Sequence, residues 1–168
     1  AHLSVGETPS ALCSDSLSNK VFCASRMSRR ISVIDGTTDK VVTTTTGDLS
    51  PSALCLNSRN GNVYCAQGAY DQSGVAVLSG ADARVISFVT TGCGPNAICY
   101  NPRSDKLYCS VAGTNEVMVF DGATNTAVAR VAVGQRSSWL CYNSRHNKVY
   151  CAAIDSGDVL VLDGAKDR

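Results

Sequence analysis

The sequence has few of the residues on which catalytic and ligand-binding sites usually depend. Two histidines in 168 residues leave little choice of imidazole base and exclude most histidine-rich metal sites. Aromatic residues make up only 6% of the chain, so platforms for stacking nucleic-acid bases are scarce. Fifteen lysines and arginines balance 14 aspartates and glutamates, and this near-neutral charge does not favour nucleic acid or an anionic membrane as a partner.

Long apolar runs and helical periodicity are also missing. No stretch approaches the roughly 18 apolar residues that span a bilayer, and we expect no signal peptide and no membrane insertion. No segment repeats its apolar residues with the period of an α-helix, which predicts an all-β domain. Motifs for a nucleophile elbow, a dinucleotide or phosphate loop and a zinc protease are absent, so we predict no enzyme activity.

Cysteine, by contrast, is abundant and regularly spaced. Eight of the nine cysteines form four pairs whose members lie ten residues apart, and the pairs repeat every 42 to 44 residues. A period of this length is typical of propellers, solenoids and repeat arrays. The pairs are Cys13/Cys23, Cys55/Cys65, Cys99/Cys109 and Cys141/Cys151.

Each repeat contains four short segments with the pattern of β-strands. In the second repeat, 52–56 and 63–66 flank a polar turn and predict a hairpin. In the first repeat, 31–34 and 41–46 are the predicted third and fourth strands. Four-stranded units with this period are typical of β-propeller blades. The predicted fold is a β-propeller whose blades cover about 4–46, 47–90, 91–132 and 133–168.

The two ends of the chain complement each other in this pattern. Residues 1–6 align with 129–134 and predict an outer strand that completes the last blade, since an unpaired edge promotes aggregation. The large core residues favour shallow angles between blades, and hence a homodimer that forms an eight-bladed ring. A closed four-bladed monomer, other assemblies and a fragment stay open as alternatives.

The state of the paired cysteines follows from the expected hairpin geometry. A turn centred on Asn60 would place Cys55 directly opposite Cys65, about 4.5–5.5 Å away at Cα and within reach of a disulfide. Buried, reduced thiols are the favoured interpretation and structural disulfides are the alternative. The spacing does not fit zinc. Cys93 lies in a loop outside the pairs and is the candidate for an exposed, reactive thiol.

Loops that differ between repeats form the predicted binding face, where a protein or glycan ligand would bind. Recurrent aspartates at 35, 121 and 163 are interpreted as turn formers. Trp139 replaces an alanine of the other repeats and either fills a packing gap or plugs the channel. We predict no catalytic, cofactor or metal site. The candidate loop residues are Arg26, Arg29, Arg30, Tyr70, Asp71, Glu116, Arg136, Asp155 and Asp158.

The third repeat resembles the YVTN-type β-propeller repeat of bacterial and archaeal surface and secreted proteins. The resemblance is carried by Gly94-Pro95-Asn96-Ala97-Ile98-Cys99-Tyr100-Asn101, by Lys106-Leu107-Tyr108-Cys109 and by Val117-Met118-Val119-Phe120-Asp121-Gly122-Ala123-Thr124-Asn125. It implies a propeller, a secreted or cell-surface location, and repeats without a shared catalytic motif. The chain departs from the family in its paired cysteines and its small number of repeats.

The predicted function is therefore a non-enzymatic scaffold or protein-interaction module that self-associates to close its ring. Two alternatives stay open. One is a propeller enzyme, a lactonase-like hydrolase or a dehydrogenase-like protein, with a site in the central channel. The inner strands offer it mainly poor ligands, such as Ser10, Ser52, Asn96 and Ser138. The other is an engineered or excised repeat fragment without a selected function.

Overall fold

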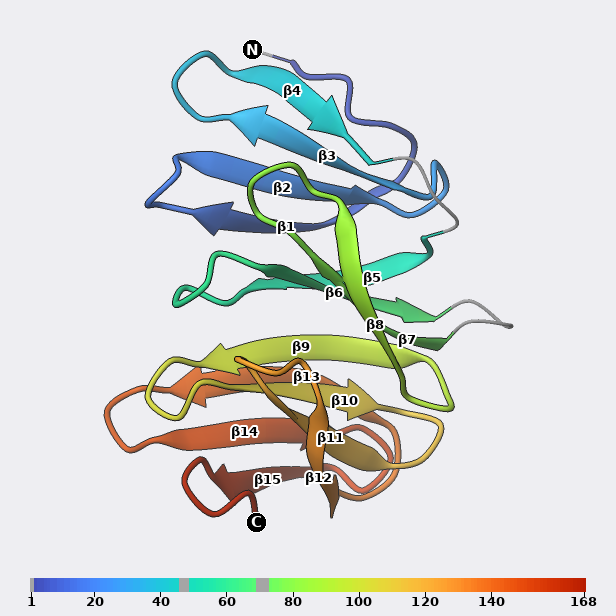
Figure 1. Cartoon of the computed structure of the whole chain (residues 1–168). Helices are drawn as coiled ribbons and strands as arrows, with labels where there is room; N and C mark the ends of the chain where they lie inside the picture. Colours follow the sequence, from blue (N-terminus) through green and yellow to red (C-terminus); the bar gives the residue numbers. More distant parts are fainter. Residues whose placement is uncertain (1, 46–48, 69–72) are drawn as a thin grey trace.

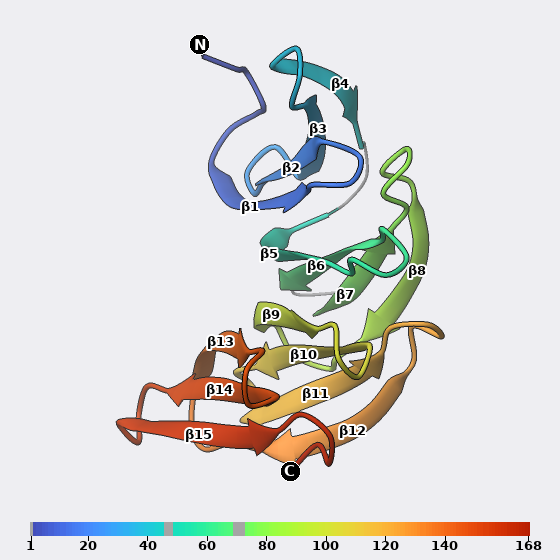
Figure 2. The same cartoon turned by 90° about the vertical axis from the view of Figure 1, so that its left-hand side faces the viewer.

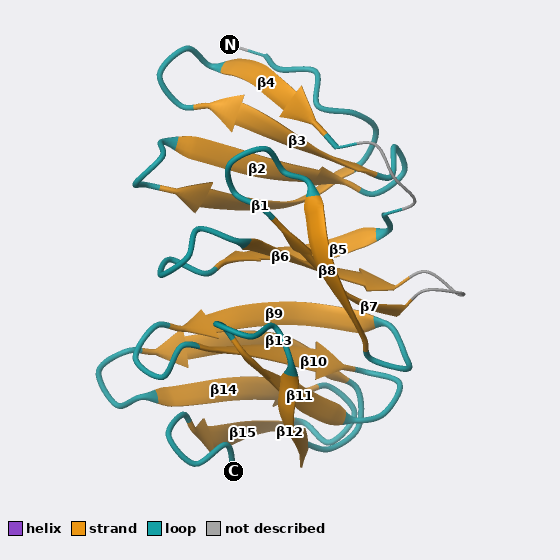
Figure 3. Ribbon diagram, in the orientation of Figure 1, coloured by secondary structure: helices purple, strands orange, loops and turns teal. Residues whose placement is uncertain are grey.

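The computed structural model describes residues 2–45, 49–68 and 73–168, and all regular elements in these ranges are strands (Figure 3). Fifteen strands form four antiparallel sheets in chain order, which we term blades 1 to 4. Blade 1 comprises β1 (Pro9–Asp15), β2 (Lys20–Ser25), β3 (Arg30–Asp35) and β4 (Lys40–Thr44). Blade 2 comprises β5 (Pro51–Leu56), β6 (Val63–Gly68), β7 (Ser73–Leu78) and β8 (Val85–Thr90). Blade 3 comprises β9 (Pro95–Asn101), β10 (Lys106–Val111), β11 (Glu116–Asp121) and β12 (Ala127–Ala132). Blade 4 comprises β13 (Ser137–Asn143), β14 (Lys148–Ala153) and β15 (Asp158–Asp163).

The blades stack face to face along an open arc (Figures 1 and 2). Their first strands contact one another in sequence, β1 with β5, β5 with β9 and β9 with β13. The fourth strands β4, β8 and β12 lie on the other side of the stack (Figure 2). Blade 1 and the carboxyl terminus lie at opposite ends (Figure 1), so the described chain does not close on itself as a four-bladed ring.

Aspartates fix the turns that follow the third strands. The Asp35 carboxylate accepts the backbone N–H groups of Thr37 and Thr38 at 3.0 and 2.8 Å. Asp121 accepts two turn N–H groups in the same way. These backbone hydrogen bonds stabilise the ionised form and lower the pKa of both aspartates. Their predicted role as turn formers is confirmed.

The strand register corrects the expected geometry of the cysteine pairs. Cys13 lies opposite Phe22, and Cys23 lies opposite Leu12. The same one-residue offset recurs in the other three hairpins. Because successive side chains point to opposite faces of a sheet, the two cysteines of a pair lie on opposite faces and cannot form a disulfide with each other. All nine cysteines are free thiols.

Each blade therefore has two faces for packing against neighbours. We term the face toward the following blade the leading face, and the face toward the preceding blade the trailing face. The leading face of blade 1, with Cys13 and Phe22, packs against the trailing face of blade 2, with Cys65 and Leu78. Equivalent residues join blade 2 to blade 3 and blade 3 to blade 4. Every interface thus receives one first-strand cysteine and one second-strand cysteine of the following blade. These combinations are Cys13 with Cys65, Cys55 with Cys109 and Cys99 with Cys151.

Tyrosines on second strands also link the blades. The Tyr108 hydroxyl lies 3.3 Å from the Gly164 carbonyl oxygen and 2.8 Å from a carboxylate oxygen of Asp167, both in blade 4. Tyr64 reaches the carbonyl of Gly122 in blade 3 at 3.2 Å. Both tyrosines are buried, and a buried hydroxyl is costly without a hydrogen-bond partner. The polar bonds and the apolar contacts therefore select the same stacking.

Blade 4 has three strands in the described chain, whereas the other blades have four. Residues 2–8 form no strand and lie against blade 1. There the Val5 carbonyl accepts hydrogen bonds from the hydroxyls of Ser25 and Ser32 at 2.9 and 3.1 Å. The expected pairing of segment 1–6 with the last blade does not occur within this chain over residues 2–6, because blade 4 lies at the far end of the arc; residue 1 lies outside the described residues.

A Tyr108→Phe variant tests the tyrosine links. Loss of the hydroxyl leaves the Gly164 carbonyl and the Asp167 carboxylate without this donor, and we expect the free energy of unfolding to fall by about 1–2 kcal/mol in urea titrations. Tyr150→Phe is the matched control, since its hydroxyl bonds no residue that the structure describes. In dilute, monomeric protein its loss should have little effect, and equal losses in both variants would contradict the assignment.

Candidate functional site

The predicted loop residues lie at one end of the blades. Backbone hydrogen bonds join the turns between second and third strands to the loops between blades, from Arg26 N to Thr8 O at 2.9 Å and from Ile154 N to Arg136 O at 3.2 Å. Tyr70 and Asp71 lie outside the described residues. The exposed members of the predicted set are Arg26, Arg29, Arg136, Asp155 and Asp158.

Several of these charges are used in pairs within the chain. Arg136 lies 3.3 Å from Asp155, and Glu116 lies 3.1 Å from Arg130 on the neighbouring strand. Arg30 is half-buried, and its Nε donates to the Val5 carbonyl at 3.4 Å. Exposed pairs of this kind contribute about 0–1 kcal/mol and hold loops together. Within the described residues, no group of three or more histidine, cysteine, aspartate or glutamate side chains is arranged to hold a metal ion.

The cysteines between blades are protected by burial. Burial raises the pKa of Cys13, Cys55 and Cys65 to about 12. It also raises the pKa of Cys99 and Cys109. A thiol with so high a pKa stays protonated at neutral pH and is a poor nucleophile and metal ligand. These residues act as small packing groups, as the favoured interpretation predicted.

The exposed thiol is not the predicted one. Cys93 is half-buried and packs between blades 2 and 3, where its side chain fills the space beside Gly113. Cys141 is exposed because it lies on the leading face of blade 4, which no other blade covers. Sequence reasoning missed Cys141 because it treated the four pairs as equivalent, although the fourth repeat has no following blade in this chain.

The leading face of blade 4 exposes apolar side chains whose counterparts are buried elsewhere. Val159 and Val161 are 63% and 48% exposed, whereas Val117 and Val119 at the same positions of blade 3 are fully buried. Trp139 lies on this face, two residues before Cys141, and is 74% exposed. A contiguous apolar patch of this kind usually marks an interaction surface.

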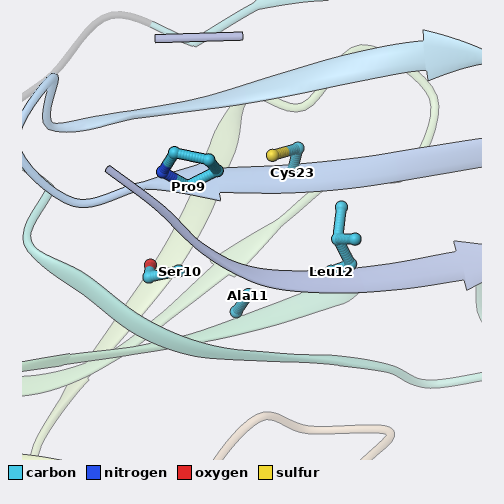
Figure 4. A pocket seen from close by; sticks show the side chains of 5 residues that line it. All are labelled: Pro9, Ser10, Ala11, Leu12 and Cys23. Atoms are coloured by element: carbon cyan, nitrogen blue, oxygen red, sulfur yellow. The ribbon is translucent and has the colours of Figure 1, made fainter. Parts of the chain in front are cut away.

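The trailing face of blade 1 is the other end of the stack, and residues 2–8 cover part of it, because the Val5 carbonyl binds the buried Ser25 and Ser32 there. The part around Leu12 contains a hollow (Figure 4). Leu12 is 66% exposed and points to the opposite side of β1 from Ala11. Because Leu12 and Cys23 are paired in register, both face away from blade 2. The hollow measures about 320 Å³ and is lined by Pro9, Ser10, Ala11, Leu12 and Cys23.

Comparison with known proteins identifies the fold alone. Neither a protein-family model nor a curated protein matches the sequence. Hydrazine synthase of Kuenenia stuttgartiensis matches 99% of this chain with a TM-score of 0.86 and 16% sequence identity. The fold is a β-propeller. The chain spans 49% of that solved chain, about half its length.

This propeller architecture is widespread, since 1236 solved chains match it, and it therefore does not indicate an activity. No helix in the described ranges is long and apolar enough to cross a membrane. The exposed apolar residues at the two ends of the blade stack, on the leading face of blade 4 and around Leu12 of blade 1, are consequently the most distinctive surfaces of the described structure.

Thiol alkylation followed by peptide mass mapping tests the burial of the interface cysteines. We expect Cys65 and Cys109 to stay unmodified in the native protein at neutral pH and to react in denaturant. Because the pKa of Cys65 is raised to about 12, raising the pH from about 7 to about 9 should leave it protonated and slow to react. Fast native labelling of either residue would show that the blade interfaces are open.

Proposed function

We propose that the chain is a non-enzymatic propeller scaffold that self-associates through the two end faces of its blade stack. The observation that carries this proposal is the leading face of blade 4, which exposes residues that are buried at the other leading faces. Every interface in the chain joins a leading face to a trailing face. Two chains joined head to tail by the same rule would form an eight-bladed ring.

Trp139 supports this arrangement as an anchor residue. Its counterpart in blade 2, Ala53, packs in one cluster with Ile98 of blade 3. Leu12 holds the position of Ile98 in blade 1, so Trp139 would meet the hollow beside Leu12 in a second copy. A large aromatic side chain that fills a pocket is a typical anchor of protein interfaces.

The inner strands favour a scaffold over an enzyme with a site in the channel. The Ser10 hydroxyl donates to the Pro51 carbonyl at 3.3 Å, and the Ser52 hydroxyl donates to the Pro95 carbonyl at 2.9 Å. Both bonds join one blade to the next, so these hydroxyls serve stacking. The rim loops at one end of the ring then form a surface for a protein or glycan ligand, as the resemblance to surface propellers also suggests.

Light scattering tests the proposed association. We expect a mass of twice the 17.6 kDa of one chain. Val159→Lys should shift the mass to that of a single chain, because it places a charge on the leading face of blade 4. Val128→Lys is the matched control, since this valine is 51% exposed on the outer strand of blade 3, away from both end faces. Wild-type protein at 17.6 kDa at all concentrations would refute self-association.

A further inference from the structure

The interface between blades 3 and 4 is closed by a set of polar contacts, which we term the turn lock. Tyr108 reaches the Gly164 carbonyl and the Asp167 carboxylate, and the Asn101 amide donates to the same carbonyl at 3.4 Å. The Lys106 ammonium forms an ion pair with Asp167, and the two side chains are only 20% and 14% exposed. Donors thus come from one leading face, and acceptors come from the last turn of the following blade.

Blades 2 and 3 share the same lock. The Tyr64 hydroxyl bonds the Gly122 carbonyl and the Asn125 side chain. The Asn57 amide donates to the Gly122 carbonyl at 3.3 Å. Asn125 and Asp167 occupy equivalent turn positions, with φ angles of 59° and 54°.

Between blades 1 and 2, the tyrosine and the polar turn side chain of this lock are both absent, and the Lys20 ammonium donates to the Gly80 and Ala81 carbonyls at 3.2 and 2.8 Å. Phe22 occupies the position of the tyrosines, since it faces Val33 as Tyr64 faces Val77. Ala83 occupies the acceptor position, with the same left-handed backbone at φ 58°. Phe22 and Ala83 are both fully buried in one apolar cluster. A tyrosine therefore occurs where the following blade has a polar side chain at this turn position, and a phenylalanine occurs where it has an alanine.

The two end faces carry the two halves of a complete lock. On blade 4, Tyr150 faces Val161 in the register of the other tyrosines, and the exposed Lys148 holds the position of Lys106. On blade 1, Asp39 is exposed with a φ of 53°, at the turn position of Asp167. Over the ranges that the structure covers, the Tyr150 hydroxyl and the Asp39 carboxylate form no hydrogen bond or ion pair.

We propose that Tyr150 and Lys148 of one copy bind Asp39 and the Gly36 carbonyl of a second copy, so that a turn lock determines which surface blade 4 accepts. The proposal rests on the self-association proposed above and names the contacts that make it specific. A second copy fits because its charge is complementary to Lys148 and because the contact continues the lock between the inner blades. The contact between these two faces is termed the seam.

Ser138 occupies the position of Ser10 and Ser52 in the repeat. Its hydroxyl is buried and has no hydrogen-bond partner among the described residues. The equivalent hydroxyls of Ser10 and Ser52 donate to a proline carbonyl in the following blade. At the seam, the corresponding acceptor is the Pro9 carbonyl of the second copy. The Ser138 hydroxyl is enclosed by its own chain, so it would have to rotate to reach that carbonyl.

A charge exchange between two variants tests the proposal. Asp39→Lys and Lys148→Glu each place like charges at both seams of a homodimer, and we expect each variant alone to be monomeric by analytical ultracentrifugation. An equimolar mixture should recover the two-chain mass, because one seam then pairs native charges and the other pairs exchanged charges. Native mass spectrometry should find one chain of each variant in the complex. Both substituted positions are exposed, and circular dichroism checks that each variant folds.

The outcomes separate this lock from self-association itself. If the wild type is monomeric, the proposed association fails and the lock fails with it. If the wild type is dimeric and each variant still dimerises alone, association stands and the lock is overturned. If both variants are monomeric and mixing restores nothing, the contact with a second copy at Asp39 is refuted.

A second comparison measures the tyrosine. Tyr150→Phe should raise the dissociation constant of the dimer by on the order of tenfold or more, because the change removes a hydrogen bond to a charged group. Tyr142→Phe is the control in the same blade, since the Tyr142 hydroxyl bonds Asn147 within the chain at 3.1 Å. An unchanged dissociation constant in Tyr150→Phe would overturn the role of the tyrosine.

Discussion

The one-residue offset within each hairpin places one cysteine on each face of its blade, and the assembly of the chain depends on this constraint. Cys13 packs forward onto blade 2, whereas its hairpin partner Cys23 faces the opposite way. Blades 2 and 3 therefore have no polar face to turn toward water. A sheet with two apolar faces is stable only when both are covered, so stacking is obligatory for each repeat. Blades 2 and 3 are covered by another blade on both sides. Blade 4 is covered on one side, and residues 2–8 cover part of the free face of blade 1. The two end faces are thus a direct consequence of the repeat.

Apolar burial alone does not fix how one blade sits on the next, because it has no preferred direction. The tyrosine and asparagine contacts supply the direction. Tyr64 and Tyr108 each bond a carbonyl in the following blade, and a blade shifted along its neighbour would bury these hydroxyls without partners. Each such loss costs about 1–3 kcal/mol, which is large beside the stability of a small domain. The paired change to Phe22 and Ala83 shows the same rule, since an apolar pair in this position leaves nothing unsatisfied.

Local signals in the sequence were sufficient for the strands and the turns, and insufficient for what joins the blades. The predicted strand 63–66 lies within β6, and Asp35 and Asp121 cap turns as expected. The cysteine register was wrong because four residues, not one central residue, separate Asp15 from Lys20 in the hairpin. The sequence signal of that turn was Asn19, because asparagine readily adopts the left-handed backbone that this residue has, with a φ of 50°. The locks were missed because Tyr64 and its acceptor Gly122 belong to different repeats, and no pattern within one repeat connects them. The exposure of Cys141 depends on which face lacks a neighbour, which spacing alone does not reveal.

A seam between two chains must be stronger than the interfaces within one chain. The inner blades are held together by the connecting loops, so their contacts form without loss of free translation and rotation. Joining two separate chains costs about 4–15 kcal/mol of that freedom. In the proposed seam, this cost would be offset by Trp139, where the other blades have alanine, and by Tyr150 and Lys148 opposite the Asp39 carboxylate of the second copy. A head-to-tail pair also forms two seams, and the second closes at high effective concentration once the first has formed. In the proposed ring, the strongest version of the repeated interface would thus lie between the two chains, where no covalent connection holds the blades together.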